Sequence, residues 1–386
     1  MIKYPLAKQT ITNDEMDFIA RWLLTHPKLT MGEITKQFEE EWAKYIGTKY
    51  AAFVNSGSSA NLLAIYALLM SGKLKRGDKV AVPAVGWGTT IAPIIQLGLI
   101  PVMFDVCPFT FGIDVTKVIN RIKMVGDISA VMFVQVLGVP ISQLEELKKA
   151  CEIYGVPLIE DSCAALGSKS ADGKMVGSFG DLSTFSFYFG HQLSTIEGGM
   201  INTNNFELYE ILLMSRSHGW GKDLSNETYS QMMMDNNIDE FHKPFTFFIP
   251  GFNLRPTDLQ AKIGLGQMKK AEWCANRRNE NHRRYIDQLR NTCEFQFPLL
   301  TERISSISFG VLSKDRKKIV ESLVANGIET RLFSAGNLAR HPFWVGEKDK
   351  FPVADIIHDE GFFLPNYPEL TLNDVDIICN IVKDSI

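Results

Sequence analysis

The stretch "YAAFVNSGSSANLLAIYALLMSG", residues 50–72, indicates the fold of the chain. An apolar run typical of a strand covered on both faces is followed by small polar residues and then by a helical segment. The same alternation of apolar run and helical segment recurs until residue 204. It predicts an α/β fold, in which a mainly parallel sheet carries helices on both sides.

The pattern divides the chain into two predicted domains. Short apolar runs predict strands at 50–56, 79–84, 100–106, 128–137, 155–161, 182–188 and 198–204. We therefore expect a large α/β domain over residues 1–250, including the N-terminal segment, and a smaller C-terminal α+β domain over 251–386. In the smaller domain we expect one strand within 305–313, a helix that stops at Gly327 and a final helix from Asp374.

The polar, irregular segment 221–244 interrupts this pattern. It is too long for an idle loop in a compact domain. We expect it to fold over a site or over a partner subunit.

Composition and charge narrow the possible functions. Among 386 residues, 40 Lys and Arg stand against 44 Asp and Glu, and the net charge of −4 gives no support for nucleic-acid binding as the main task. No apolar run could span a bilayer and the N-terminus lacks a signal-peptide core, so we expect a cytoplasmic protein without a membrane partner. The 6 cysteines are widely spaced and the 7 histidines show no H-E-x-x-H pairing, which favours buried free thiols and no metal site.

Candidate site residues follow the predicted strands, because ligands of open parallel sheets bind at the carboxyl ends of the strands. After the first strand, Gly57 and Ser58 lie among small residues that lead into a helix, an arrangement that binds phosphate but also serves as a plain helix N-cap. After the second strand, Trp87 could stack on a flat ligand or pack in the core.

The later strands end in polar residues. Glu160 and Asp161 end one strand, where a carboxylate suits a protonated ring nitrogen, a helix N-cap or a nearby arginine. His191 follows the strand that contains Ser186, and an imidazole there is either structural or a proton carrier. Together, a phosphate cradle, an aromatic plate, a carboxylate and a base fit a planar, phosphorylated ring that contains nitrogen.

The chain resembles a known family over nearly its whole length. The motifs that carry the resemblance occur in order: "NSGSSA" (55–60), "IEDSCAALGS" (159–168), "GSFGDLSTFSFY" (177–188), "EGGM" (197–200), "RSHGW" (216–220), "PGFNLRPTDLQAKIG" (250–264) and "GIETRL" (327–332). They are similar to those of the sugar aminotransferase and dehydratase family of the DegT/DnrJ/EryC1/StrS type, which uses pyridoxal 5′-phosphate (PLP). The resemblance implies the fold type I of PLP-dependent transferases, similar to aspartate aminotransferase, and a homodimer with shared active sites.

The resemblance also implies roles for single residues. Phosphate contacts would come from Gly57, Ser58 and Ser186, ring stacking from Trp87, pairing with the pyridine nitrogen from Asp161, and a phosphate contact in the neighbouring subunit from Asn253. His191 stands where aminotransferases of the family carry the lysine that binds PLP covalently. Imidazole forms no stable Schiff base but can move protons, so the substitution removes the amine and keeps a base.

The family's 3-dehydratases share this histidine. The resemblance therefore implies C3 deoxygenation of a nucleotide-linked 4-keto-6-deoxy sugar, with GDP-4-keto-6-deoxy-D-mannose as the expected substrate and L-glutamate converting PLP to pyridoxamine 5′-phosphate (PMP). His191 would remove a proton from the C4′ carbon of the cofactor as the C3 hydroxyl leaves. No cysteine lies between Cys163 and Cys274, so no iron–sulfur cluster is expected.

Some positions leave alternatives open. His218, Lys222 and Arg331 are candidate substrate contacts, although His218 could instead pack and Arg331 could form a structural ion pair. Ala164 replaces the Gln or acid that relatives place near the phenolic oxygen of the cofactor. The open alternatives are a related enzyme acting on a CDP- or dTDP-linked sugar, an atypical aminotransferase or oxidase, and a non-catalytic protein that binds a nucleotide sugar.

Overall fold

The computed structural model describes residues 2–290, 292, 303–348 and 350–386. In these residues a 7-stranded sheet has the strand order β1-β7-β6-β5-β4-β2-β3. Its strands are β1 (Tyr50–Val54), β2 (Lys79–Pro83), β3 (Ile100–Phe104), β4 (Ala130–Val134), β5 (Leu158–Asp161), β6 (Leu182–Ser186) and β7 (Gly199–Thr203). Only β7 runs antiparallel to its neighbours, β1 and β6. Each strand lies within a predicted run, so the prediction of a mainly parallel sheet is confirmed.

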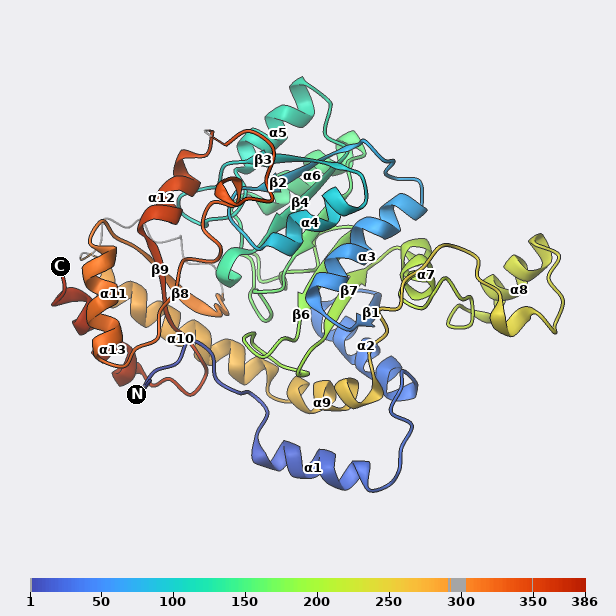
Figure 1. Cartoon of the computed structure of the whole chain (residues 1–386), viewed down its shortest axis with the longest axis horizontal. Coiled ribbons are helices and arrows are strands. Elements are labelled where there is room, and N and C mark those ends of the chain that lie inside the picture. Colours follow the sequence, from blue (N-terminus) through green and yellow to red (C-terminus); the bar gives the residue numbers. More distant parts are fainter. Residues whose placement is uncertain (1, 291, 293–302, 349) are drawn as a thin grey trace.

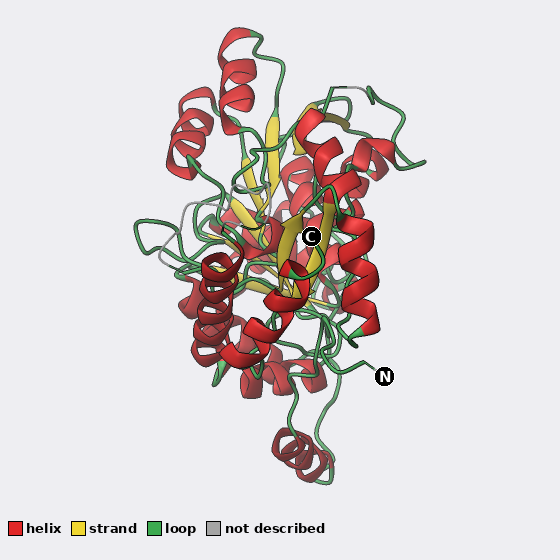
Figure 2. Ribbon diagram, turned by 90° about the vertical axis from the view of Figure 1, so that its left-hand side faces the viewer, coloured by secondary structure: helices red, strands yellow, loops and turns green. Residues whose placement is uncertain are grey.

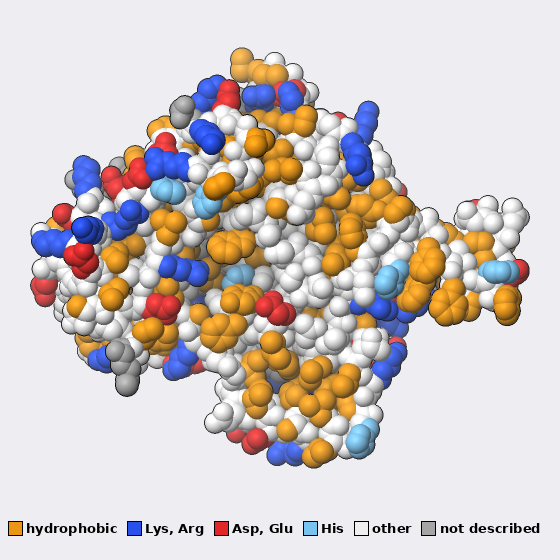
Figure 3. Space-filling model, in the orientation of Figure 1, with side chains coloured by type: hydrophobic (Ala, Val, Ile, Leu, Met, Phe, Trp, Pro, Cys, Tyr) orange, Lys and Arg blue, Asp and Glu red, His pale blue; other side chains and the backbone are white. Residues whose placement is uncertain are grey.

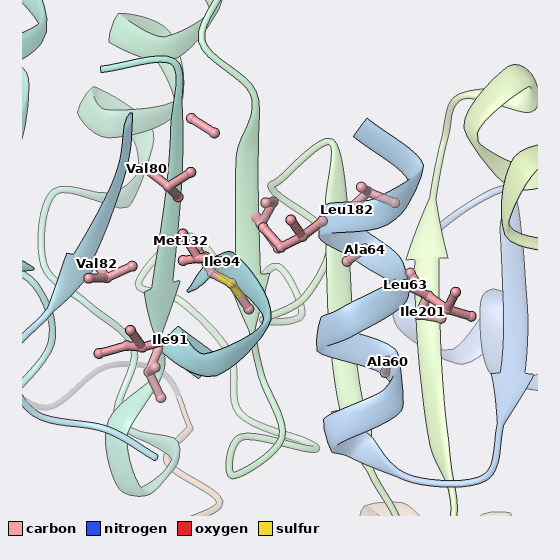
Figure 4. Close-up of a cluster of buried hydrophobic side chains, with 14 of the residues drawn as sticks. Ala60, Leu63, Ala64, Val80, Val82, Ile91, Ile94, Met132, Leu182 and Ile201 are labelled. Carbon is pink, nitrogen blue, oxygen red and sulfur yellow. The ribbon is translucent and has the colours of Figure 1, made fainter. Parts of the chain in front are cut away.

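Helices cover both faces of this sheet (Figure 2). One face packs against α3 (Gly57–Met70), α4 (Gly88–Gln96) and α7 (Phe206–Ser215), and the other against α2 (Glu33–Ile46), α5 (Val115–Met124), α6 (Leu144–Tyr154) and α9 (Asp258–Met268). Side chains alternate between the faces along each strand. In β4, Met132 points toward α4 while Phe133 points toward α5 and α6. Figure 4 shows the first of these layers, with Leu63 of α3 against Ile201 and Ile94 of α4 against Met132.

A second, smaller core lies at the end of the molecule that carries both termini (Figure 1). It is built on the antiparallel pair β8 (Ser308–Leu312) and β9 (Gly361–Pro365), with α10 (Ala271–Leu289), α11 (Arg316–Ala325) and α13 (Leu372–Lys383) around it. Tyr4 of the N-terminal segment also packs in this core. The predicted domain boundary between residues 250 and 251 stays a prediction.

Several predictions for the C-terminal half need correction. The strand within 305–313 and the helix before Gly327 are confirmed, as β8 and α11. The last helix begins at Leu372 and not at Asp374, because the Thr371 side chain caps it by accepting from the main-chain nitrogen of Asp374. Helix α12 (Pro352–Glu360) and strand β9 were not predicted.

Two helices and three short turns complete the described elements. They are α1 (Asn13–Leu23), α8 (Asn226–Asp235) and three short 3₁₀ turns, Val136–Gly138, Lys243–Phe245 and Leu338–Arg340. The arm, residues 221–244, carries α8 and projects away from the body of the molecule (Figure 1). No helix in the described ranges is both long and apolar enough to cross a lipid bilayer.

Candidate active site

A cavity of about 560 Å³ lies between the two sheets, at the carboxyl ends of β4, β5 and β6. The large sheet contributes residues that follow its strands, as expected for an open α/β fold. The smaller sheet contributes Ser308 and Phe363. The cavity brings together most of the predicted site residues: Gly57, Ser58, Trp87, Asp161, Ser186, His191 and Arg331. No residue of the arm lines this cavity, and the alternative that the arm folds over a partner subunit stays a prediction.

The N-terminus of α3 forms one end of the cavity. Ser56 caps the helix by accepting a hydrogen bond of 3.1 Å from the main-chain nitrogen of Ser59. The exposed Ser58 hydroxyl lies 3.0 Å from that of Thr89. The backbone is packed so closely that a Cβ atom on Gly57 would lie 2.6 Å from the Cβ of Ser186. Ser56 therefore supplies the cap, and the other hydroxyls and the helix N-terminus remain to bind an anion such as phosphate.

The Asp161 carboxylate is buried and held by neutral donors. Its Oδ2 accepts from Asn61 Nδ2 at 2.9 Å and from the Thr90 hydroxyl at 2.6 Å, and its Oδ1 accepts from the Cys163 main-chain nitrogen at 3.2 Å. Asn61 is oriented in turn by the hydroxyl of Thr184, which donates to Asn61 Oδ1 at 2.6 Å. No Lys, Arg or His of the described chain forms an ion pair with Asp161, so an arginine partner is wrong. A buried anion without a cation suits a positively charged ligand group.

The neighbouring Glu160 has a structural role. It is fully buried and accepts hydrogen bonds from the main-chain nitrogens of Gly177, Phe179 and Gly180 at 3.0, 2.6 and 2.6 Å. Burial raises the pKa of this carboxyl, while the three hydrogen bonds act in the opposite direction. Because successive side chains of a strand point to opposite faces, only Asp161 of this pair reaches the cavity.

His191 lies in the turn after β6, and its ring is half-buried at the cavity wall. Its Nδ1 lies 3.3 Å from the main-chain oxygen of Ser186. A carbonyl oxygen only accepts, so Nδ1 carries the proton and Nε2 is left as an acceptor. Burial is the main reason that the pKa of His191 is lowered to about 4; Arg278 and Arg331 lower it further, while Asp161 raises it. The ring is therefore a neutral base at pH 7.

Trp87 and Arg331 also line the cavity. Trp87, at the start of α4, is 56% exposed, so the alternative of core packing is wrong. The Arg331 guanidinium lies 5.4 Å from the centre of the Phe363 ring and forms no ion pair within the described ranges. The alternative of a structural ion pair is therefore also wrong, and Arg331 remains available for an anionic ligand group.

The wall beside Asp161 is largely apolar. Cys163, Ala164 and Leu137 line it. Burial raises the pKa of the Cys163 thiol well above its ordinary value. Ala164 offers no polar side chain there, in keeping with the substitution noted in the sequence.

The other predicted site residues, His218, Lys222 and Asn253, lie outside the cavity. They belong to a group that we call the Trp220 cluster: His218, Trp220, Lys222, Phe247, Asn253 and Arg255. Phe247 stacks on Trp220 at 5.6 Å, and His218 meets that ring edge-on at 5.1 Å. Lys222 Nζ lies 4.4 Å from the centre of the Trp220 ring. Asn253 Oδ1 accepts from Arg255 Nε at 3.1 Å. The chain thus does not bring His218, Lys222 or Asn253 to its own cavity.

Sequence reasoning missed the partners that hold Asp161. Asn61 could have been noticed as a polar residue in an otherwise apolar helical run, "ANLLAIYALLM". The sequence around Thr90 and around Thr184 has no comparable feature that would single these threonines out. Gln192, next to His191, was also missed; it is fully buried.

Metal binding and disulfide formation have less support in the described residues. They contain no group of three or more His, Cys, Asp or Glu side chains placed to bind a metal ion. No disulfide joins the described cysteines; Cys151, Cys274 and Cys379 are buried as expected, whereas Cys107 and Cys163 are only partly buried. Cys293 lies outside the described residues.

The fold and the cavity define the class of aminotransferase-fold proteins that use PLP. Within that class, the chain belongs to the DegT/DnrJ/EryC1/StrS aminotransferase family, whose family model matches residues 10–383.

Named relatives are similar along the entire chain. GDP-4-keto-6-deoxy-D-mannose 3-dehydratase of Yersinia pseudotuberculosis is 34% identical and covers 99% of both chains. The solved structure of the E. coli protein of that name, with bound hydrated PLP, superposes with a TM-score of 0.90 at 32% identity, covering 99% of this chain and 100% of that one. A structure of GDP-4-keto-6-deoxymannose-3-dehydratase with a trapped PLP-glutamate geminal diamine gives a TM-score of 0.89 at 31% identity, covering 99% of this chain and 100% of that one.

Proposed function

We propose that the chain is a 3-dehydratase that uses PLP and its amine form PMP to remove the C3 hydroxyl of a nucleotide-linked 4-keto-6-deoxy sugar. The substrate that we propose is GDP-4-keto-6-deoxy-D-mannose, and the amine donor is L-glutamate. The relatives named above support both, one by its name and the other by its trapped glutamate adduct. We place the activity in the cytoplasm.

The residues of the cavity fit the cofactor. Gly57 and Ser58 at the start of α3 and Ser186 at the end of β6 suit its phosphate, and Trp87 suits the face of its ring. The buried Asp161 carboxylate, which has no cation of its own, suits the protonated ring nitrogen. When bound, the cofactor supplies an electron sink.

One observation carries the choice of reaction. The described residues that line the cavity include His191 and no lysine. A lysine amine would bind the cofactor covalently and could return a proton to sugar C4, which would complete an amine transfer. The neutral imidazole would instead accept a proton at Nε2 from the bound cofactor and sugar and would pass it to the departing C3 hydroxyl. Elimination is therefore favoured over transamination of the sugar.

The Trp220 cluster supports a homodimer with shared sites. Its aromatic rings and cations, Lys222 and Arg255, suit a nucleotide diphosphate but lie outside the chain's own cavity. We propose that His218, Lys222 and Asn253 complete the cavity of the partner subunit, with Asn253 reaching the cofactor phosphate. Exposed apolar side chains around α1 and on the arm, such as Leu24 and Phe241, would be buried between the subunits (Figure 3).

The test is a substrate panel. The purified protein is incubated with PLP, L-glutamate and GDP-, CDP- or dTDP-linked 4-keto-6-deoxy sugars. We expect the GDP sugar to give ammonia, 2-oxoglutarate and a product one oxygen atom lighter than the substrate, and no product without glutamate. Turnover of another nucleotide sugar would correct the substrate, and an amino sugar product would overturn the dehydratase assignment.

A further inference from the structure

Gln192 links two walls of the cavity. It directly follows His191, is fully buried, and its Nε2 donates to the main-chain oxygen of Ala164 at 2.7 Å and to that of Ser305 at 2.6 Å. Ala164 lines the cavity in the loop after β5. Ser305 lies on the chain that leads into β8, whose first residue, Ser308, lines the opposite wall.

The two carbonyl groups converge on one buried point. A Cβ atom on Gly138 would lie 2.7 Å from the Ala164 oxygen and 2.7 Å from the Ser305 oxygen. Neither oxygen has another hydrogen-bond partner in the part of the chain that the structure describes. Two buried carbonyls that face one another need a donor between them, because each unpaired group costs about 1–3 kcal/mol. The Gln192 amide supplies both hydrogens.

The orientation of this amide is determined by its surroundings. If the amide were turned over, its oxygen would face two carbonyl oxygens and no donor would remain. In the observed orientation, Oε1 is buried and forms no hydrogen bond to a described residue. The Gln192 amide thus leaves its own oxygen without a hydrogen bond while its nitrogen pairs two carbonyls. The two carbonyls therefore determine where the amide lies.

Few hydrogen bonds hold the turn that carries His191. Between Tyr188 and Thr195 the main chain is held by the His191 nitrogen to the Tyr188 oxygen at 3.0 Å and by the Thr195 nitrogen to the Phe187 oxygen at 2.9 Å. The Ser194 nitrogen also donates to Gln267 Oε1 at 3.4 Å, in α9, which carries neither of the two carbonyls that Gln192 pairs. The Gln192 side chain ties this turn to the two walls. We propose that Gln192 is a positioning residue for His191: its amide clamps the Ala164 and Ser305 carbonyls and thereby fixes the imidazole against the space for the cofactor. This inference rests on the proposed function.

The first test compares two replacements of similar shape. Gln192→Met lacks both donors, and we expect kcat to fall roughly 10- to 100-fold, as small misplacements of a reacting group do, with KM for the sugar changed less than about 3-fold. Gln192→Glu has no donor when ionised but one O–H when protonated. Its kcat should therefore recover relative to that of Gln192→Met as the pH is lowered from 8 to 5, which a general loss of stability would not produce.

A matched control is Asn202→Leu. Asn202 is also a buried amide that links two elements, since its Oδ1 accepts from Trp42 Nε1 at 3.0 Å and its Nδ2 donates to the Thr48 hydroxyl at 2.8 Å. Neither Asn202 nor its two partners line the cavity. This variant should lose stability and keep its kcat per folded molecule.

The second test does not need turnover. The His191 ring is followed by NMR in histidine-labelled protein and assigned with His191→Asn. Asp161, Arg278 and Arg331 are the charges that act on this ring, and none of them is altered. A loosened turn admits water, so the titration midpoint should move from near 4 toward 6.5 in Gln192→Met and stay in place in Asn202→Leu. The buried His282 serves as an internal reference.

The outcomes separate the two proposals. If the unmutated protein turns over no sugar, the proposed function fails, and the NMR midpoint still decides whether Gln192 holds the ring. If the unmutated protein is active and Gln192→Met keeps both its kcat and its midpoint, the inference is overturned. If Gln192→Met does not fold, the pH dependence of Gln192→Glu decides, and an unchanged profile overturns the inference.

Discussion

The Nδ1 atom of His191 lies 3.3 Å from the main-chain oxygen of Ser186, the last residue of β6. The strand therefore fixes the tautomer of the ring and leaves Nε2 to act as the base. Because the pKa of His191 is lowered to about 4, the neutral form persists far below pH 6.5. We expect kcat/KM to stay flat from pH 8 to about 5 and to fall only near 4, in protein confirmed to be folded. A half-maximal value near 6.5 would contradict this assignment.

His191→Lys should convert the site to covalent cofactor binding. A lysine amine in the same turn faces the same cavity and can react with the PLP aldehyde. After borohydride treatment, mass spectrometry should show the variant heavier by the reduced cofactor, and dehydration should be lost. The unmutated protein and His191→Asn should show no added mass. Trapping in the unmutated protein would instead indicate a reactive lysine elsewhere.

Gly57→Ala should damage the phosphate end of the cavity. The added Cβ would lie 2.6 Å from the Ser186 Cβ and 3.1 Å from the Cys163 sulfur, so the backbone must move, at a cost of about 1–3 kcal/mol. A loss of 1.4 kcal/mol in binding would weaken PLP affinity about tenfold. Gly88→Ala is the matched control at the start of α4, where the added atom meets nothing within 4 Å. Equal PLP affinity in the two variants would count against this reading.

Shared sites predict complementation between inactive variants. His191→Asn removes the base of one chain, and Asn253→Leu removes the proposed contact to the partner's cofactor. Each homodimer should be inactive, but a mixed dimer has one site with neither change. Activity should therefore return when the two proteins are unfolded and refolded together. If mixing restores nothing while both variants form dimers, Asn253 acts within its own chain.

His282 should contribute a pH-dependent term to stability. It is 3% exposed, its Nδ1 lies 2.9 Å from the Ser306 hydroxyl, and burial lowers its pKa to about 3. Between pH 6.5 and 3, His282 is protonated in the unfolded chain and neutral in the folded chain. The free energy of unfolding should thus fall as the pH falls, by at most about 1.4 kcal/mol per unit from this residue. His282→Gln should flatten the slope in denaturant titrations, and replacing the exposed His26 should not.

The sequence predicted the large sheet well, because its strands are covered on both faces. Val131 and Phe133 pack on one side and Met132 and Val134 on the other, so every position of β4 is apolar. The same logic failed at residues 352–365. Helix α12 ends at Glu360 and β9 begins at Gly361, so no turn residues separate them, and a short apolar run reads equally as helix or strand.

The site was predictable where topology alone places residues. Asp161, Ser186 and His191 lie at or just beyond strand ends, and parallel strands end at the same edge of the sheet. Asn61 and Thr90 escaped prediction because they reach Asp161 from the sides of α3 and α4, and such contacts depend on how the helices pack. Within the Trp220 cluster, His218, Lys222 and Asn253 were predicted as site residues, whereas Trp220, Phe247 and Arg255 were not, because their ring and cation contacts depend on how separate loops pack.

Strand β5 carries two acids with opposite tasks, Glu160 holding a loop through three main-chain nitrogens and Asp161 facing the cavity. Inserting or deleting one residue within 156–159 would turn each of the two side chains to the opposite face of the sheet. The main-chain nitrogens of Gly177, Phe179 and Gly180 would then lose their acceptor, and the cavity would lose its carboxylate. Length variation among natural homologues should therefore avoid this strand altogether, and gaps should gather in the surface turns on either side of it.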